Sequence, residues 1–489
     1  MDWARDNVGL SESDLTNVFK YVPRESTIVH LLSDNKYRAQ ISSLQSDDEW
    51  SSWLQQELPT AERPESGLVL ILAKRLGEPP GPSGTKMSSN DWLQQADIQP
   101  SISFQKSRAT TFSTFPEKLS GNQGSTGIAA GSGRRGVRTL PFSRETFEQI
   151  TGAFFTHSSI ARVISRSDVP FFSSESVQIQ QQAHVYNCRS SNAWDMDLAL
   201  SETYFPERSL TFAILYGCTA PIEKEIIKRL ALVQEEATHP VLMPGIFAEL
   251  ERSRHMKLVQ SKIAMLETRI LELDIHSGDI DMPKRVDSDE RNMAKRTAWL
   301  DTTYLRNGLL SWNTQLGRMI QDLKEFEKSV YKPTQTQRPA LPGKYELARD
   351  MSEGVHRDSD SDDGLTPLRW NRASIPDSDY SLFGDADSGR GRLAGEKGTE
   401  MIPMPRFSDV GELDYEYHQG TIVAGKKIKG RLLMIRDEYQ DWIRDCTMRV
   451  DGMAMATQWA QGETNVEIAL ATKQDSRDIP CRSLQYDVF

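Results

Sequence analysis

Three stretches of this chain repeat apolar residues at alternating spacings of three and four, the pattern of helices that pack along their whole length. The strongest of them carries one continuous apolar stripe: Leu305, Leu309, Trp312, Leu316, Met319, Leu323, Phe326 and Val330. At 489 residues the chain also exceeds what one hydrophobic core usually organises. The pattern therefore predicts long helices that pack side by side, outside a single compact core.

The other two stretches predict a helical hairpin and a separate stalk helix. Residues 239–274 carry one seam, and the polar loop before the strongest stripe is short, so these two helices are expected to run antiparallel. The third helix is expected to begin near Gly425. We predict coiled-coil packing at Leu305, Leu309, Trp312, Leu316, Met319, Leu323, Phe326, Leu432, Ile435, Tyr439, Trp442 and Met453.

The first half of the chain has the signals of strands mixed with helices. The run SGLVLILAKRL, around residues 66–76, reads as a strand buried on both faces. VPFFS, SVQIQQQAHVYNCRS and SLTFAILYGC are expected to be further strands of the same sheet, and Ser143 precedes a short helix. These signals predict an α/β core, so that the whole chain belongs to the α+β class.

Changes in composition divide the chain into seven parts. Gly, Ser and Pro dominate one insertion, and an acidic polar tract that cannot fill a core forms another; both are expected to be disordered. The expected order is the start of the α/β domain (1–76), a flexible insertion (77–138), the rest of the domain (139–238), the helical hairpin (239–332), the acidic insertion (333–424), the stalk helix (425–477) and a divergent tail (478–489).

Charge and hydropathy exclude several classes of protein. With 58 Lys+Arg against 69 Asp+Glu, the formal net charge is −11, which argues against a nucleic-acid partner. No apolar run approaches the roughly 20 residues of a membrane-spanning helix, and the N-terminus lacks the pattern of a secretory signal. We therefore expect a chain without a membrane span of its own, in the cytoplasm.

No catalytic constellation is visible, so we do not expect an enzyme. The acidic run DSDSDDG, residues 358–364, has Asp363 where a calcium-binding EF-hand loop needs its Gly. The helical hairpin carries carboxylates that are compatible with weakly held divalent cations or with an ordinary solvated face: Glu249, Glu251, Glu267, Glu272 and Asp274. No spacing assigns metal ligands to particular residues.

Two stretches resemble a known family. HPVLMPGIFAELERSRHMKLVQSKIAMLETRILELD, residues 239–274, is similar to the first long helix of the CorA-like divalent-cation transporters of filamentous fungi. EYQDWIRDCTMRVDGMAMATQWAQGETNVEIALATKQDSR, residues 438–477, resembles the stalk helix of that family, above all in MAMATQW, TNVEIALAT and QDSR. Residues 299–320 also resemble this family, and residues 140–164 resemble it more loosely.

The resemblance implies a cytoplasmic α/β/α domain, an antiparallel helix pair and a long stalk helix that leads into the membrane. Members of the family are integral membrane proteins that assemble as pentamers and select Mg²⁺ with a Gly-Met-Asn loop. Here neither transmembrane helix nor that tripeptide follows residue 477. The expectation is a product truncated before the membrane spans, not competent for transport alone.

Two functions follow as hypotheses. The first is the cytoplasmic, regulatory part of a CorA-like magnesium or other divalent metal ion transporter. It would bind Mg²⁺ or another divalent cation weakly, as a homo-oligomer or in mixed oligomers with full-length relatives that link it to the membrane. The alternative is a soluble coiled-coil interaction or scaffold protein that kept the fold without ion transport.

Overall fold

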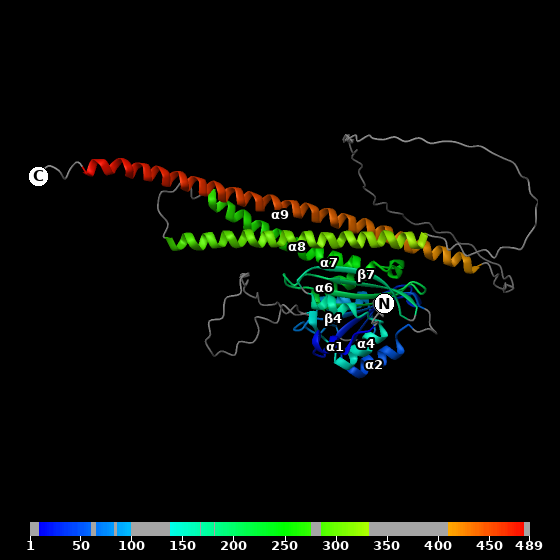
Figure 1. The fold of residues 1–489 in the computed structure, drawn as a ribbon. Helices are drawn as coiled ribbons and strands as arrows, with labels where there is room; N and C mark the ends of the chain where they lie inside the picture. The colour runs from blue at the N-terminus through cyan, green and yellow to red at the C-terminus, as the bar shows by residue number, and fades with distance from the viewer. Residues whose placement is uncertain are drawn as a thin grey trace, which may run out of the picture. The chain divides into compact units, whose positions relative to one another are not determined.

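The computed structural model describes residues 9–59, 65–82, 86–98, 137–166, 168–179, 181–274, 285–331 and 409–483 (Figure 1). Most of the two predicted insertions, and the tail from residue 484, lie outside these residues. The described residues form an α+β fold, as predicted: an N-terminal domain built on a sheet, followed by long helices.

One mixed sheet organises the N-terminal domain, and its strand order is β5-β3-β2-β4-β10-β9-β8-β7. β4 and β10 pair in parallel at the centre, and the other pairings in this sheet are antiparallel. Its strands are β2 (Ser26–Leu32), β3 (Gln40–Leu44), β4 (Gly67–Lys74), β5 (Met87–Ser88), β7 (Phe171–Gln178), β8 (Gln182–Arg189), β9 (Ala199–Phe205) and β10 (Leu210–Cys218). β1 (Lys20–Tyr21) and β6 (Thr139–Leu140) form a separate parallel pair.

Alternation along β4 shows how the sheet divides two cores. Leu68, Leu70 and Leu72 belong to one buried cluster, and the residues between them belong to the other. At the start of the strand Gly67 has a φ of +129°, and a Cβ there would overlap the carbonyl oxygen of Leu31 on β2. The buried run that predicted this strand is therefore apolar on both faces because helices cover both.

Helices cover both faces of the sheet, which makes the domain an α/β/α sandwich. Side chains of α1 (Glu12–Asn17), α2 (Asp47–Gln56), α4 (Arg144–Ala153) and α5 (Ser159–Ser165) join one cluster. The opposite cluster contains side chains of α3 (Ser89–Ile98), α6 (Ala220–Leu230), α7 (Leu242–Asp274), α8 (Arg285–Tyr331) and α9 (Asp409–Ser483). The helix predicted after Ser143 is α4, whose Thr146 amide donates to the Ser143 hydroxyl over 3.0 Å.

Part of the segment expected to be a flexible insertion is ordered, which corrects that prediction. β5 and α3 lie within residues 77–138, and the Trp92 side chain of α3 is buried in the core. The Asp91 amide donates to the Ser88 hydroxyl at the start of this helix. Gly and Pro residues in the surrounding sequence masked the pattern of this helix. Its stability comes from tertiary packing, chiefly that of the buried Trp92 indole.

The three long helices have defined directions relative to one another. Phe247 lies against Trp312, and Lys262 forms an ion pair with Asp301, so α7 and α8 are antiparallel. The carboxylate of Glu267 accepts from Arg449 over 2.7 Å, and Glu249 accepts from Arg431, so α9 runs parallel to α7. Figure 1 shows α9 alongside α8, in agreement with the ion pair of Lys429 with Glu327.

The stalk helix is longer at both ends than its sequence pattern indicated. α9 begins at Asp409 rather than near Gly425, and it ends at Ser483 rather than at residue 477. The apolar seam begins only at the later position, so periodicity could not locate the start. None of the described helices contains an apolar stretch long enough to cross a membrane.

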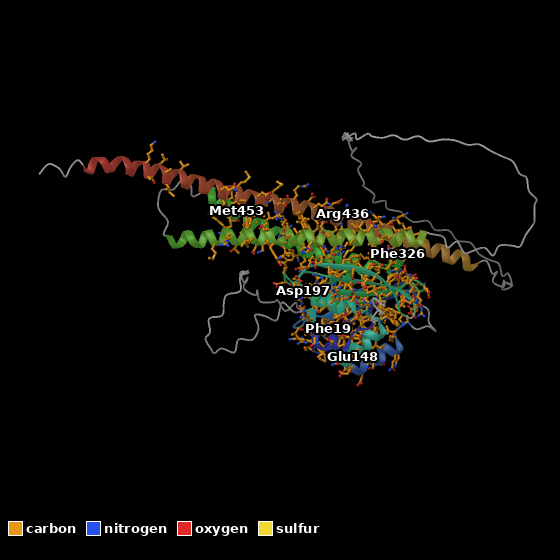
Figure 2. All side chains as sticks on the ribbon, viewed as in Figure 1. Phe19, Glu148, Asp197, Phe326, Arg436 and Met453 are labelled. Carbon is orange, nitrogen blue, oxygen red and sulfur yellow. The ribbon has the colours of Figure 1, made fainter. Side chains whose placement is uncertain are left out.

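The residues predicted to form coiled-coil packing are buried or partly buried, and Phe326 packs on the sheet, against His184 of β8 and Tyr204 of β9. Phe326 of α8 and Met453 of α9 are among the side chains labelled in Figure 2. Phe326 and Trp442 are partly buried against the main cluster, and Met453 lies in a small separate one with Leu266 and Ala298. The other predicted positions are buried in the main cluster: Leu305, Leu309, Trp312, Leu316, Met319, Leu323, Leu432, Ile435 and Tyr439.

Candidate functional site

The candidate site lies where β4, β8 and β10 end. Because β8 pairs antiparallel with β9, and β9 with β10, these three strands point the same way. In open α/β sheets, ligands commonly bind at the carboxyl ends of the strands, where the chain reverses its strand order. Here the ends carry Arg75 after β4, Arg189 on β8 and Thr219 after β10.

One buried carboxylate joins two of these strand ends. Asp197, just before β9, pairs through Oδ1 with Arg75 and accepts through Oδ2 from Arg189 over 2.7 Å. The side chains of Asp197 and Arg189 are each 2% exposed. Arg189 also donates to the carbonyl of Leu198 over 3.0 Å. The bridge therefore fixes the loop of residues 190–198 against the sheet.

Arg254 of α7 holds the same loop from the other side. Its Nη1 donates to the carbonyl oxygens of Ser191, Trp194 and Asp195 over 3.3 to 3.4 Å. Its Nη2 donates to Glu251 Oε2 over 2.6 Å. The ion pair neutralises a carboxylate that is 1% exposed, so Arg254 can hold the loop against α7 without leaving a buried charge unpaired.

Next to this ion pair, α7 touches the stalk helix through a hydrogen bond. His255 Nδ1 lies 2.6 Å from the Tyr439 hydroxyl of α9, and the two rings meet edge to face. Burial holds the pKa of His255 well below its usual value and raises the pKa of Tyr439. Both groups are therefore neutral at pH 7, and the bond is one between uncharged partners.

The indole of Trp194, at the tip of the loop, packs against α8. The Trp194 ring packs edge to face on His255, with the ring centroids 5.3 Å apart, and tilts against Tyr304. A Cβ on Gly308 would overlap this ring. Only a glycine at this turn of α8 leaves room for the indole, so Trp194 joins the loop, α7 and α8.

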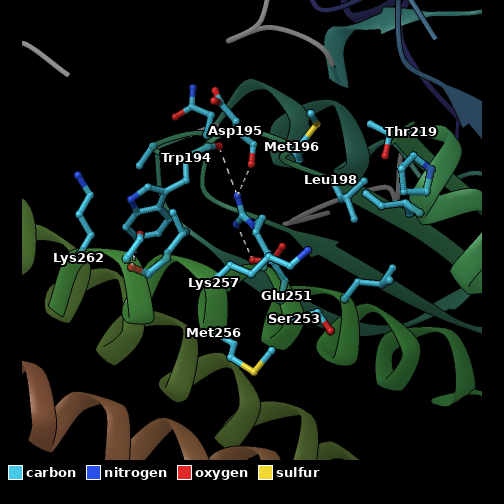
Figure 3. Close-up of a pocket in the computed structure, with 18 of the residues that line it drawn as sticks. Trp194, Asp195, Met196, Leu198, Thr219, Glu251, Ser253, Met256, Lys257 and Lys262 are labelled. Carbon is cyan, nitrogen blue, oxygen red and sulfur yellow. Dashed lines mark hydrogen bonds and ion pairs between the residues drawn. The ribbon is translucent and has the colours of Figure 1, made fainter. Parts of the chain in front are cut away.

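These elements line a half-open cavity of about 1480 Å³. Its walls are the loop, the start of α6, the middle of α7 and one turn of α8, as Figure 3 shows in close-up. Apolar side chains line it together with seven charged residues. Apolar walls that carry placed polar groups are common in small-molecule sites. Its lining includes Trp194, Leu198, Ile222, Leu250, Lys257 and Leu258.

The acidic residues considered as a cation-binding face are engaged in ion pairs. Glu249 pairs with Arg431, Glu251 with Arg254, and Glu267 with Arg449. The side chains of Glu272 and Asp274 lie outside the described part. Among the residues that the structure describes, no group of three or more His, Cys, Asp or Glu side chains could hold a metal ion.

Sequence reasoning missed this site. Arg75 and Asp197 are 122 positions apart, and nothing in the local pattern of either indicates the other. One available signal was a charged residue at the end of a buried apolar strand, as at Lys74 and Arg189, since such a charge needs a buried partner.

Comparison of the sequence with models of known protein families, and with curated proteins, finds no match for this chain. The fold and the site together define an α/β/α domain with a ligand-sized cavity, joined to three long helices.

Proposed function

We propose that this chain is the cytoplasmic, cation-responsive part of a CorA-like magnesium or other divalent metal ion transporter, active as a homo-oligomer or in mixed oligomers with full-length relatives. The order of elements supports the proposal: an α/β/α sandwich, an antiparallel helix pair and one very long helix follow each other as the resemblance implies. The proposal depends mainly on one observation: the outer face of α9 is a continuous exposed row that includes large apolar side chains.

That face has an unbroken row of exposed residues at alternating spacings of four and three. We call it the outer stripe: Val423, Lys427, Gly430, Met434, Asp437, Asp441, Arg444, Met448, Asp451, Met455 and Gln458. Its large apolar members, Val423, Met434, Met448 and Met455, are each between 49% and 62% exposed. The opposite side of the same helix contacts α7 and α8. Lys427 of the outer stripe pairs with Glu236, and the rest of the stripe remains for copies of α9 to pair through.

Carboxylates on the outer stripe would make this association sensitive to cations. Asp441 pairs with Arg444 of its own helix over 2.5 Å, whereas Asp451 has no ion pair within the described part of the chain. If copies of α9 pair through the outer stripe around a symmetry axis, stripe residues near that axis meet their own equivalents, so their like charges repel. A divalent cation that reduces this repulsion would shift the equilibrium toward the oligomer.

Sedimentation velocity of the purified full chain tests the proposal. We expect a small species in chelator and a larger, defined oligomer in millimolar Mg²⁺, compared with NaCl of matched ionic strength. The double variant Met434→Asp with Met448→Asp is expected to stay small in both. A profile that is the same in chelator and in Mg²⁺ would contradict the cation response.

A matched control separates the outer stripe from exposed helix surface in general. Asn307→Asp with Gln321→Asp adds the same two charges at the same spacing, at exposed positions on α8. This variant should associate like the wild type. Equal loss of association in both double variants would contradict the role of the outer stripe.

The second candidate function, a coiled-coil scaffold protein, is favoured by the same exposed apolar row and by the ion pairs that occupy Glu249 and Glu267. It predicts association that depends on Met434 and Met448 but is indifferent to Mg²⁺. The sedimentation experiment therefore distinguishes the two candidates.

A further inference from the structure

The cavity beside the loop of residues 190–198 has an apolar floor. Leu198 follows the loop, Ile222 lies in the first turn of α6, and Leu250 and Leu258 face the space from α7. These four side chains come from three separate elements. A volume of about 1480 Å³ holds a drug-sized molecule with room for water.

Most charges on the cavity wall are neutralised within the protein. Glu225 pairs with Arg229 over 2.8 Å, and Lys262 pairs with Asp301 over 2.7 Å. Arg254 and Glu251 neutralise each other, as described above. Two charged groups of the wall, Asp195 and Lys257, have no ion pair among the described residues.

Lys257 and Asp195 differ in their relation to the apolar floor. Lys257 lies on α7 between Leu250 and Leu258, and Figure 3 shows its side chain running along the face of α7 that lines the cavity. Asp195 belongs to the loop on the opposite wall, and its backbone carbonyl already accepts from Arg254. An unpaired ammonium group beside an apolar surface recognises a molecule with an anionic head and an apolar body.

We infer that this cavity binds an amphipathic anion, with its carboxylate or phosphate head at Lys257 and its apolar body on Leu198, Ile222 and Leu250. The apolar body supplies affinity through the area that it removes from water. The ammonium group supplies selectivity for charge, because the charge beside the apolar floor is positive, whereas Asp195, which would attract a cationic head, lies on the opposite wall. The site is independent of the outer stripe and of the proposed cation response.

Competition against a fluorescent probe tests the inference with the full chain. The probe is 1-anilinonaphthalene-8-sulfonate, and the competitors are decanoate, decyl phosphate and decyltrimethylammonium, which share one chain and differ in the head. Decanoate or decyl phosphate should displace the probe, and the stronger of the two identifies the head group. Decyltrimethylammonium should compete at least about tenfold more weakly, since a charge-assisted hydrogen bond is lost.

Two further measurements make the test specific to this site. Lys257→Gln should weaken decanoate binding about tenfold, whereas Lys228→Gln, an exposed lysine of α6 outside the cavity wall, should not. Along the series hexanoate, octanoate and decanoate, each added methylene should tighten binding up to about fourfold. Equal competition by the cationic and anionic decyl compounds, or equal affinities of the wild type and Lys257→Gln, would overturn the inference.

Discussion

The imidazole of His255 lies 2.6 Å from the hydroxyl of Tyr439, measured from Nδ1 to Oη, where α7 meets the stalk helix. Both groups are buried, and burial keeps His255 uncharged at neutral pH by lowering its pKa. A buried hydrogen bond contributes most when its loss leaves a polar atom without a partner. This pair therefore helps to set the register of α9 on α7.

Tyr439→Phe tests that role. It removes only the hydroxyl, leaves Nδ1 of His255 unpaired, and is expected to lower the free energy of unfolding by about 1 to 3 kcal/mol. Urea unfolding followed by circular dichroism measures the change. Tyr304→Phe, at a position 51% exposed, is the control and should change the free energy of unfolding by less than about 0.5 kcal/mol.

Asp197→Ala tests the bridge between the strand ends. Arg75 and Arg189 would lose a shared buried carboxylate, so the variant should lose about 3 to 5 kcal/mol of folding free energy. Chemical denaturation compares it with Asp195→Ala, which removes an exposed carboxylate two positions earlier and should be nearly neutral. Similar losses in both variants would mean that the bridge does not stabilise the loop.

Gly308→Ala is expected to displace the Trp194 ring without breaking α8. A Cβ at this position overlaps the ring, and the ring is the part that can move. The indole N–H resonance of Trp194, assigned by its loss in Trp194→Phe, should shift. Gly317→Ala on the same helix meets no atom within 4 Å; it should leave that resonance in place and stabilise the helix by about 0.5 to 1 kcal/mol.

Glu202 on β9 predicts a dependence of stability on pH. Burial raises its pKa well above the usual value, and neither carboxyl oxygen has a hydrogen-bond partner among the described residues. The folded chain keeps this proton where the unfolded chain releases it. The stability linked to Glu202 is therefore complete below the unfolded pKa near 4.5 and decreases as the pH rises toward the folded pKa.

The variant Glu202→Gln should abolish that loss. Relative to the wild type, its unfolding free energy should rise with pH above about 4.5, by about 1.4 kcal/mol per pH unit. Glu175→Gln, an exposed position on β7, is the control and should follow the wild type. Parallel curves for Glu202→Gln and the wild type would show that Glu202 is ionised in the folded protein.

Buried histidines give folding stability the opposite dependence on pH. Desolvation lowers the pKa of His30 and of His239 to about 4, so the folded chain resists protonation that the unfolded chain accepts near 6.5. Stability linked to these groups is complete above pH 6.5 and decreases as the pH falls toward 4. His30→Phe, which keeps an aromatic ring against Trp53, should make the unfolding free energy less dependent on pH in this window.

Much of the fold was predictable where the controlling pattern is local. The central strand is a run of apolar residues, and α8 is a stripe whose spacing repeats every few residues, so neighbours in sequence were sufficient. β9 was not predicted, because Ser201, Glu202 and Thr203 interrupt its apolar character although all three are buried. α3 was missed because Trp92 is its single large buried side chain, and the Gly, Ser and Pro residues around the helix dominate the local composition.

The sequence by itself determined the α+β class and the order of the long helices, though not the ends of α9, since apolar periodicity acts over a few residues and specifies which face must be buried. Only the tertiary structure decided that Asp197 bridges Arg75 and Arg189 and that the Trp194 ring packs on Gly308. It also decided that α9 runs parallel to α7 rather than antiparallel. These relationships join residues far apart in the chain, and they form only when packing brings buried charges to partners that no local pattern identifies.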